Sequence, residues 1–527
     1  MSEEGCQQGD PLGPLLFCVT IHPILQSLTS NLKVGYMDDI TLGGPEAVVA
    51  NDVSIVQSAG QDIGLHLNIA KCEQITKVTA TTSPIDQFAH VTPSNATLLG
   101  APLTAGPVMD ATLMKQLTEL KRASSRLELI ARHDALILLR ASCGAPKLQH
   151  VLRCAPCAGH PLLLDIDTVL RQCLELIINV EIGDDQWKQA SLPIGAGGLG
   201  IRSVSNIAAS AFLASESSTQ QLQGKLLEHS AFDAPDLHFD RLKESWLLSH
   251  QSLVPPSGSQ ANKQKSWDKP SVDSTYTELL ASNTDDYNRA RLIASTAAHS
   301  GDWLHALPIS ACGLRLDDEA IRIAVGLRIG ANLCEPHDCP CGAKVDCRGS
   351  HGLSCKTSYG KTARHAYMND IVYRSLVKAG VPSNKEPAGL SRTDGKRPDG
   401  VTLVPWVSGK CAVWDVTVIN TLAVSYLSST SVSACSAAEL AAARKEEKYA
   451  MLSTEHMFIP LAFESLGPIG AKAINFLREL GRRLTAVTDD TRETAFLFQR
   501  VSVCLQRFNA VCFRGSFVCP AADTDTD

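Results

Sequence analysis

The chain has no uninterrupted apolar run that approaches the length of a membrane span, which argues against a transmembrane protein. It has no excess of positive charge either. The formal net charge is −7, so a phosphate-binding surface would have to be a local basic face. Glu3 and Glu4 make the first residues acidic, and we expect no signal peptide. Without a secretory signal, the 18 cysteines are expected to be reduced thiols, some of them available to a metal.

The rest of the composition is that of a globular protein, with 44% hydrophobic and 20% charged residues. Its 527 residues suffice for about three domains. The most informative segment is 34–42, where two apolar runs meet at Asp38 and Asp39. This pattern predicts a β-hairpin with two acids at its tip. Such acids can hold a divalent metal that bridges the attacking and leaving oxygens in phosphoryl transfer.

An isolated Asp-Asp pair is more often a solvated turn, so its neighbours decide the interpretation. Residues 7–17 form a loop restricted by glycine and proline, and Pro14 suits the first position of a following helix. Residues 64–73 predict a turn into a short strand that carries Lys71, and residues 98–103 give another apolar-Gly-Pro break. This succession resembles the second half of a reverse transcriptase palm.

The resemblance implies a role for each of these segments. Gln8, Gly9 and Pro11 would flank the template and the incoming deoxynucleoside triphosphate. Tyr36, Asp38 and Asp39 would form the YxDD hairpin that binds Mg²⁺. Lys71 would end the next motif, and residues 99–100 would begin the primer-gripping segment.

Palms of this family carry a further metal-binding aspartate and template-binding fingers before the Gln-Gly loop. Only four residues precede Gly5, so we expect neither feature here, and we expect that the chain as given does not polymerise. A truncated gene model, a decayed copy and a deliberately shortened product all stay open.

The following region is rich in basic residues at helical apolar spacing. It predicts helices with a basic outer face, which a polymerase could use as a thumb, although a solvated helix surface is an equal alternative. Three acids oppose eight basic residues between positions 111 and 153, and the basic ones are Lys115, Lys121, Arg122, Arg126, Arg132, Arg140, Lys147 and Arg153.

Three further segments follow. The Leu-Pro…Gly-Gly-Leu-Gly-Ile element in 187–202 recurs after the polymerase in LINE-like, non-LTR retrotransposons, and we interpret it as structural. Cys154, Cys157 and His160 have metal-like spacing, but prolines break the stretch and no fourth ligand is evident, so zinc is not favoured there. Residues 251–272 are rich in Ser, Pro, Gln and Lys and predict a linker.

Thiols and imidazoles are concentrated between residues 334 and 355, which predicts a tetrahedral, structural Zn²⁺ site. The favoured ligands are Cys339, Cys341, His351 and Cys355. The alternatives, because C-x-C is tighter than the usual spacing, are Cys334, His337 and Cys347.

A second phosphoryl-transfer site is predicted beyond this cluster. Residues 397–404 and 411–419 are two β-rich runs, and as a hairpin they bring Asp399 and Asp415 close enough to share one Mg²⁺ (or Mn²⁺). The Ala-rich segment 437–450 predicts a helix with Lys445 and Tyr449 on one face at i, i+4. Two metal-binding carboxylates and a lysine suit the hydrolysis of a phosphodiester.

This second site resembles the PD-(D/E)XK, restriction-enzyme-like endonuclease of site-specific non-LTR retrotransposons, in which a CCHC knuckle comes first. The resemblance implies that Asp399 and Asp415 are the metal-binding acids, with Lys445 the lysine and Tyr449 its companion. Glu386 could be a further acid from the first helix of that domain. Lys448 stays open as the alternative lysine.

We therefore expect an α+β protein made of a partial reverse transcriptase palm, a helical thumb, a zinc knuckle and a mixed-sheet restriction-endonuclease-like domain. The expected ranges are palm 1–105, thumb and connection 106–250, linker 251–272, helical docking segment 273–333, knuckle 334–356 and endonuclease 360–515. The expected function is that of a retrotransposon-derived reverse transcriptase and endonuclease fragment, in which the polymerase is expected to be inactive and the C-terminal domain nicks DNA with a divalent metal. The expected partners are target DNA and an RNA template in the nucleus, with no membrane partner. The alternative is a domesticated or decayed nucleic-acid-binding protein without enzymatic activity.

Overall fold

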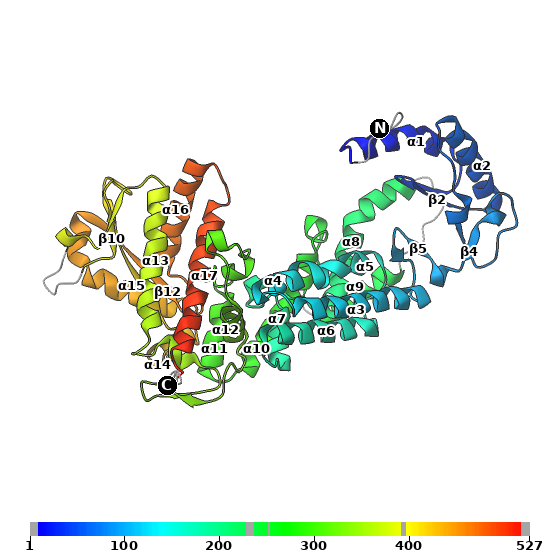
Figure 1. The fold of residues 1–527 in the computed structure, drawn as a ribbon. Coiled ribbons are helices and arrows are strands. Elements are labelled where there is room, and N and C mark those ends of the chain that lie inside the picture. Colours follow the sequence, from blue (N-terminus) through cyan, green and yellow to red (C-terminus); the bar gives the residue numbers. More distant parts are fainter. Residues whose placement is uncertain (1–8, 228–236, 251–252, 391–396, 518–527) are drawn as a thin grey trace, which may run out of the picture. The chain divides into compact units, whose positions relative to one another are not determined.

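The computed structural model describes residues 9–227, 237–250, 253–390 and 397–517, which mix helices with small sheets as the expected α+β class requires (Figure 1). The helices are α1 (Gly13–Ser27), α2 (Glu46–Asp62), α3 (Pro107–Leu127), α4 (Arg132–Leu138), α5 (Ala145–Cys154), α6 (Pro161–Ile178), α7 (Asp184–Ser191), α8 (Val204–Leu227), α9 (Leu237–Ser249), α10 (Gln264–Ser282), α11 (Asp286–Thr296), α12 (Asp318–Ile329), α13 (Tyr359–Lys378), α14 (Val424–Thr430), α15 (Ser436–Lys448), α16 (Ala471–Thr488) and α17 (Glu493–Arg514). The strands are β1 (Leu32–Tyr36), β2 (Asp39–Gly43), β3 (Glu73–Ile75), β4 (Ala89–Val91), β5 (Thr97–Leu98), β6 (Ala101–Pro102), β7 (His337–Asp338), β8 (Lys344–Val345), β9 (Ser383–Lys385), β10 (Gly400–Thr402), β11 (Cys411–Ile419) and β12 (His456–Glu464). Within the described ranges, none of the helices is both long and apolar enough to cross a membrane.

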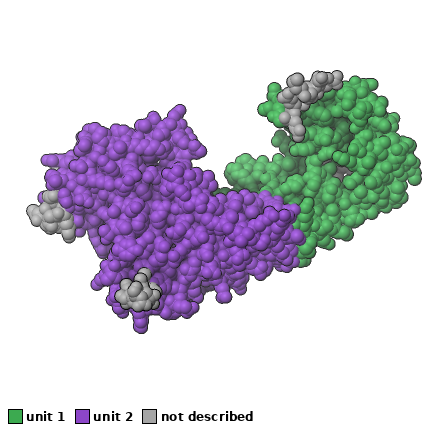
Figure 2. All heavy atoms as spheres, in the orientation of Figure 1, with its two compact units in different colours: residues 1–116, 148–163, 205–269 green, residues 117–147, 164–204, 270–527 purple. Residues whose placement is uncertain are grey.

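The chain divides into two compact units, coloured separately in Figure 2. Unit 1 contains residues 1–116, 148–163 and 205–269, and unit 2 contains residues 117–147, 164–204 and 270–527. The expected thumb range, 106–250, is therefore shared between both units. The knuckle and the endonuclease range belong to unit 2.

In unit 1, β1 and β2 form the expected antiparallel hairpin, with Tyr36 paired to Asp39 across a tight turn. The start of this hairpin is fixed by Asp52 of α2, which is fully buried. Its carboxylate accepts hydrogen bonds from the backbone N–H groups of Thr29 (2.8 Å) and Ser30 (2.6 Å). Burial alone would raise the pKa of Asp52, but these hydrogen bonds outweigh it and hold the pKa below its usual value.

Two of the segments expected to belong to the palm have the following local structure. Lys71 lies at the end of a short 3₁₀ turn, so the expected strand begins only at Glu73, after the lysine. Leu99 and Gly100 form the tip of the β5–β6 hairpin, and both have positive φ. His150 of α5 contacts the carbonyl oxygen of Leu99 at 3.0 Å, which ties this hairpin to a helix of the same unit.

The expected linker 251–272 is wrong at its C-terminal end, because α10 already begins at Gln264. Trp267 of this helix is buried against Trp246, with ring centroids 5.3 Å apart. The Trp246 indole donates a hydrogen bond to the Trp267 carbonyl at 3.0 Å. Although the segment is polar overall, it contains one large apolar residue, Trp267, which packs the start of α10 against Trp246 within unit 1.

The expected basic outer face needs a similar correction. Arg140 turns inward and donates a hydrogen bond to the carbonyl of Leu304, and burial lowers the pKa of its guanidinium. Lys147 forms a salt bridge with Glu119. Arg140 and Lys147 therefore make contacts within the protein, and they contribute less to a basic surface than the sequence suggests.

The glycine-rich element after α7 makes a close-packed turn in unit 2, consistent with a structural role. A Cβ on Gly198 would lie 2.0 Å from the carbonyl oxygen of Leu192, so no larger residue fits without a backbone shift. The buried guanidinium of Arg328 donates hydrogen bonds to the carbonyls of Gly198 and Ile194, both at 3.0 Å. The turn and α12 are therefore joined through one arginine.

The endonuclease range contains a four-stranded mixed sheet in the order β12-β11-β10-β9. Strands β11 and β12 are parallel, whereas β10 is antiparallel to both of its neighbours. One face of the sheet packs against α13, α16 and α17 (Figure 1). Trp414, Leu461 and Phe463 belong to that core. The other face carries Ala462, which packs against Ala438 of α15.

Candidate active site and metal centre

Side-chain alternation along β11 places Asp415 on the face of the sheet covered by α15. Its neighbours Trp414 and Val416 point into the core on the opposite face. Asp415 is buried, with 5% of its side chain exposed. The ammonium of Lys445 pairs with Oδ2 of this carboxylate, and the hydroxyl of Tyr449 donates to Oδ1 at 3.1 Å. The i, i+4 pair expected from the sequence thus meets one carboxylate.

Asp399 lies beside Asp415 on the neighbouring strand edge. The backbone N–H of Asp399 donates to the carbonyl of Trp414 at 3.0 Å, and the next residue, Gly400, pairs with Trp414 in the ladder. Residues opposite each other in such a pair have Cβ atoms about 5 Å apart. The structure therefore places the two acids as cross-strand neighbours. Oδ2 of Asp399 also accepts a hydrogen bond from the backbone N–H of Val416 at 2.6 Å.

A histidine that sequence reasoning missed completes this arrangement. Nε2 of His365, on α13, lies 3.1 Å from Oδ2 of Asp399 and 3.1 Å from the carbonyl oxygen of Val416. One turn later, Asn369 donates to the carbonyl of Asp399 at 3.3 Å. The i, i+4 spacing of His365 and Asn369 marks one helical face, but sequence alone does not show that this face meets β10.

The charges in the site influence one another. Burial raises the pKa of Asp415, and the negative charge of Asp399 raises it further, while Lys445 and Tyr449 oppose the shift. The hydrogen bond to Asp399 raises the pKa of His365, although its partial burial acts in the other direction. Two carboxylates placed side by side form a site where a cation is favourable.

Glu386 does not come from the first helix, as the resemblance implied. It follows β9 on a loop with φ of 45°, whereas α13 ends at Lys378. Its side chain is 69% exposed and approaches Arg397 at 3.7 Å. The Nζ atom of Lys448 lies 3.2 Å from the Tyr449 hydroxyl. The carboxylate of Asp415 is thus paired with Lys445, the favoured of the two lysines.

The four favoured zinc ligands come together at the knuckle. The ligand atoms of Cys339, Cys341, His351 and Cys355 all lie within 4.8 Å of one another. The Sγ atoms of Cys339 and Cys355 are 3.7 Å apart, and Sγ of Cys341 lies 3.2 Å from Nε2 of His351. Two sulfurs bound to zinc at about 2.3 Å and at the tetrahedral angle are separated by about 3.8 Å. The donor set and its spacing fit a closed, four-ligand zinc site.

Electrostatics favour a thiolate in this cluster. Burial alone would raise the pKa of Cys355, but hydrogen bonds from Thr357 and from neighbouring thiols lower it to about 6. The alternative ligands are engaged elsewhere. The thiol of Cys347 donates to Asn332 at 3.0 Å, that of Cys334 points to the Asp346 carbonyl at 3.4 Å, and the His337 ring stacks on Phe517.

The site residues expected in the palm, where the structure describes them, lie at the surface of unit 1. Asp38, Asp39 and Lys71 are exposed, and so are Gly9, Pro11 and Tyr36, while Gln8 lies outside the described residues. Across the described positions, no third Cys, His, Asp or Glu groups with Asp38 and Asp39. The less favoured set Cys154, Cys157 and His160 does not form a ligand group there either.

Two comparisons with known proteins bear on these sites. Residues 1–103 match the family described as reverse transcriptase (RNA-dependent DNA polymerase). The retrotransposable element SLACS 132 kDa protein of Trypanosoma brucei gambiense is 23% identical to the chain over 505 residues. The match covers 92% of this chain and 38% of that protein, so the chain spans less than two fifths of the relative's length. Together the family match and this relative support the prediction of a retrotransposon reverse transcriptase.

Proposed function

We propose that the protein works in the insertion of a non-LTR retrotransposon, with unit 2 nicking target DNA in the nucleus and residues 1–103 contributing to the reverse transcription of an RNA template. The observation that carries the endonuclease is the convergence of Asp399, Asp415, Lys445 and Tyr449 at one end of a mixed sheet. Asp415 lies on β11, Asp399 directly precedes β10, and Lys445 and Tyr449, from the end of α15 and the residue after it, both contact the Asp415 carboxylate.

The residues divide the chemistry of phosphodiester hydrolysis between them. Water adds to phosphorus and one ester P–O bond breaks, which leaves a phosphomonoester and a hydroxyl group. Asp399 and Asp415 would hold a divalent metal, which when bound supplies Lewis-acid activation of phosphate and water. Lys445, fixed by its ion pair with Asp415, offers a positive charge to the developing negative charge. Tyr449 holds the Asp415 carboxylate in place through its hydroxyl.

The knuckle would hold Zn²⁺ through Cys339, Cys341, His351 and Cys355 as a structural element, because four protein ligands leave no open coordination position. In the palm, Asp38 and Asp39 at the hairpin turn would contribute to a Mg²⁺ site for deoxynucleoside triphosphates. The DNA target and the RNA template are the partners that this proposal requires.

The nuclease is tested by nicking of supercoiled plasmid DNA with Mg²⁺ or Mn²⁺. Asp399→Asn and Asp415→Asn should each abolish nicking because both carboxylates are needed to hold the metal. Asp370→Asn is the matched control: Asp370 is an acid of the same domain that pairs with Arg374 and Lys385 instead. Equal nicking by all three variants would refute the assignment. Nucleic-acid binding without any nicking would favour the non-enzymatic alternative.

A further inference from the structure

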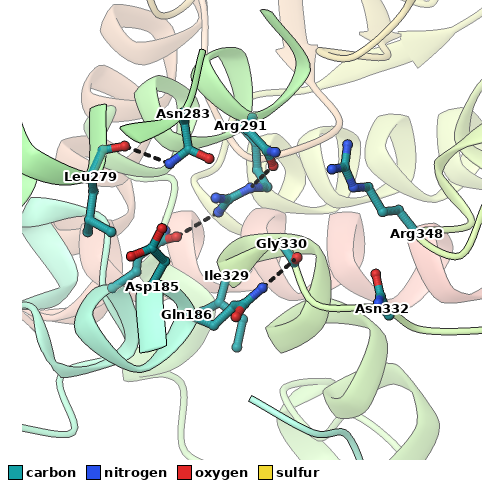
Figure 3. A pocket seen from close by; sticks show the side chains of 11 residues that line it. Asp185, Gln186, Leu279, Asn283, Arg291, Ile329, Gly330, Asn332 and Arg348 are labelled. Carbon is teal, nitrogen blue, oxygen red and sulfur yellow. Dashed lines mark hydrogen bonds between the residues drawn. The ribbon is translucent and has the colours of Figure 1, made fainter. Parts of the chain in front are cut away.

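Unit 2 contains a polar pocket that neither the nuclease site nor the knuckle explains (Figure 3). It encloses about 170 Å³ between α7, the end of α10, the start of α11 and the segment after α12. Arg291, Arg348, Asn288, Asn332 and Asp185 are among its lining residues. Figure 3 shows Arg291 in the middle of this group with its hydrogen bonds drawn.

The pocket is built on buried positive charge. Arg291 lines the pocket and donates to the carbonyl of Arg328, which does not itself line it, and each arginine is only 5% exposed. Arg291 donates to the side-chain oxygen of Gln189 at 2.7 Å and to the Arg328 carbonyl, and Arg328 donates only to backbone carbonyls. Among the described residues, neither guanidinium has a carboxylate within salt-bridge distance. Burial lowers the pKa of both to about 10, which still leaves them charged at neutral pH.

Arg348 is the second arginine that lines this pocket. It directly follows Cys347 of the knuckle, and its guanidinium lies 4.6 Å from the centre of the Tyr287 ring. A stacked guanidinium keeps the donors along its edge available. In the described part of the chain, Arg348 has no salt bridge. The nearby acids include Asp185, which lines the pocket, and Asp285, whose carboxylate accepts two hydrogen bonds from Asn288 at 2.8 Å. Asp346 is also close, because its charge acts on Tyr287 together with that of Arg348.

Buried charges in proteins are normally neutralised by a partner. Here two arginines and one acid, Asp185, line the pocket, and among the described residues neither lining guanidinium has a carboxylate within salt-bridge distance. The group still required is an anion small enough for the pocket and able to accept several N–H donors. A phosphate group meets these requirements, because its oxygens match the planar fork of an arginine.

We propose that this pocket binds a phosphate group, and that the phosphate belongs to the backbone of bound nucleic acid. We assign the phosphate to nucleic acid because residues 1–103 match the reverse transcriptase family, which implies a nucleic-acid partner. The pocket would then be a fixed docking point next to the knuckle, separate from the cleavage site. Arg348 is the residue that contacts the phosphate from the rim.

The first experiment measures thermal unfolding of the full chain in inorganic phosphate and in chloride at equal ionic strength. A ligand that binds only the folded state raises the Tm. Phosphate should raise the Tm of the wild type and of Lys344→Ala, and not that of Arg348→Ala. Lys344 is the matched control because it lies on the same knuckle but pairs with Asp338 at its exposed surface. Arg348→Lys keeps the positive charge but lacks the planar guanidinium, so phosphate should raise its Tm by an intermediate amount. This variant provides the test if Arg348→Ala does not fold.

The second experiment measures binding of a fluorescent oligodeoxythymidine without added divalent metal, so that its outcome is independent of nicking. Arg348→Ala should bind roughly tenfold more weakly than Lys344→Ala. Its slope of log affinity against log salt should also be smaller by about 0.7, the value for one single-strand phosphate contact. If phosphate raises the Tm through Arg348 but Arg348→Ala binds the oligonucleotide as well as Lys344→Ala does, the pocket would bind free phosphate and not the nucleic-acid backbone. No Arg348-dependent change in either experiment would overturn the site.

Discussion

The lysine assignment gives the sharpest test of the nuclease, because the two candidates stand three residues apart on one helix. The ammonium of Lys445 pairs with Asp415, whereas that of Lys448 lies over the Tyr449 ring, 4.6 Å from its centre. Replacing each lysine with methionine keeps the length of the side chain and its helix propensity and removes only the charge. We expect Lys445→Met to lose nicking activity and Lys448→Met to keep most of it.

The size of the loss follows from the position of the charge. The Lys445 side chain is 26% exposed and its partner Asp415 only 5%, so the pair is largely shielded from water. A unit charge about 4 Å from the developing charge, at an effective dielectric constant of about 20, contributes about 4 kcal/mol. That corresponds to a rate factor on the order of 10³. At the dielectric constant of water the same charge contributes about 1 kcal/mol, which limits the expected effect of Lys448 to less than about tenfold.

The assay is a single-turnover measurement of plasmid nicking with protein in excess and saturating Mg²⁺. Both variants should first show thermal unfolding close to that of the wild type, so that a lost rate reports on chemistry. A loss confined to Lys448→Met would show that the lysine is misassigned. Full activity in both variants would show that no lysine of α15 stabilises the transition state.

Three further predictions follow from contacts described above. Cys339→Ser should lose bound zinc, measured by elemental analysis of the purified protein, whereas Cys347→Ser should retain it because Cys347 lies outside the ligand group. Asp52→Ala should lower the free energy of unfolding of unit 1 at pH 7 by about 1.5–3 kcal/mol in urea titrations, because it removes charge-assisted hydrogen bonds. Because the pKa of Asp52 is lower in the folded than in the unfolded state, Asp52 contributes its full stabilisation above the unfolded pKa of about 3.9. That stabilisation is lost as the pH falls through the folded-state pKa. If Asp52→Ala were still less stable than the wild type below that pH, the charged carboxylate would not be the cause. Gly198→Ala should lower the stability of unit 2 by about 1–3 kcal/mol or more. Gly195→Ala should leave it unchanged, because a Cβ there would meet nothing within 4 Å. Equal melting temperatures of the two variants would show that the turn around Gly198 can shift at little cost.

Short-range patterns predicted most of what the structure places in these sites. The Tyr36–Asp39 hairpin depends on two apolar runs around one turn, and its pairing appears as expected. The meeting of Lys445 and Tyr449 depends on helical periodicity, and both reach Asp415. In each case the relevant geometry is contained in a few consecutive residues.

The failures concern contacts between segments distant in sequence. Glu386 has the right chemistry for a third acid, but the direction of its loop keeps it exposed. His365 supplies a contact to Asp399 because α13 crosses the sheet at that edge, which no local pattern encodes. Part of the expected linker is instead a packed helix, because burying Trp267 stabilises the helix despite the polar composition of the segment.

The expected knuckle and the proposed nuclease domain both pack against α17. A Cβ on Gly349 would lie 2.0 Å from the Phe513 ring, and one on Gly352 would lie 2.5 Å from the carbonyl oxygen of Cys512, so the knuckle backbone packs directly on α17. The same helix packs in one core with α13, which carries the site histidine. Loss of the metal in Cys355→Ser should therefore loosen the end of α17 and reduce plasmid nicking, although neither nuclease acid is touched. A variant that has lost its zinc and still nicks DNA at the wild-type rate would show that the two centres are mechanically independent.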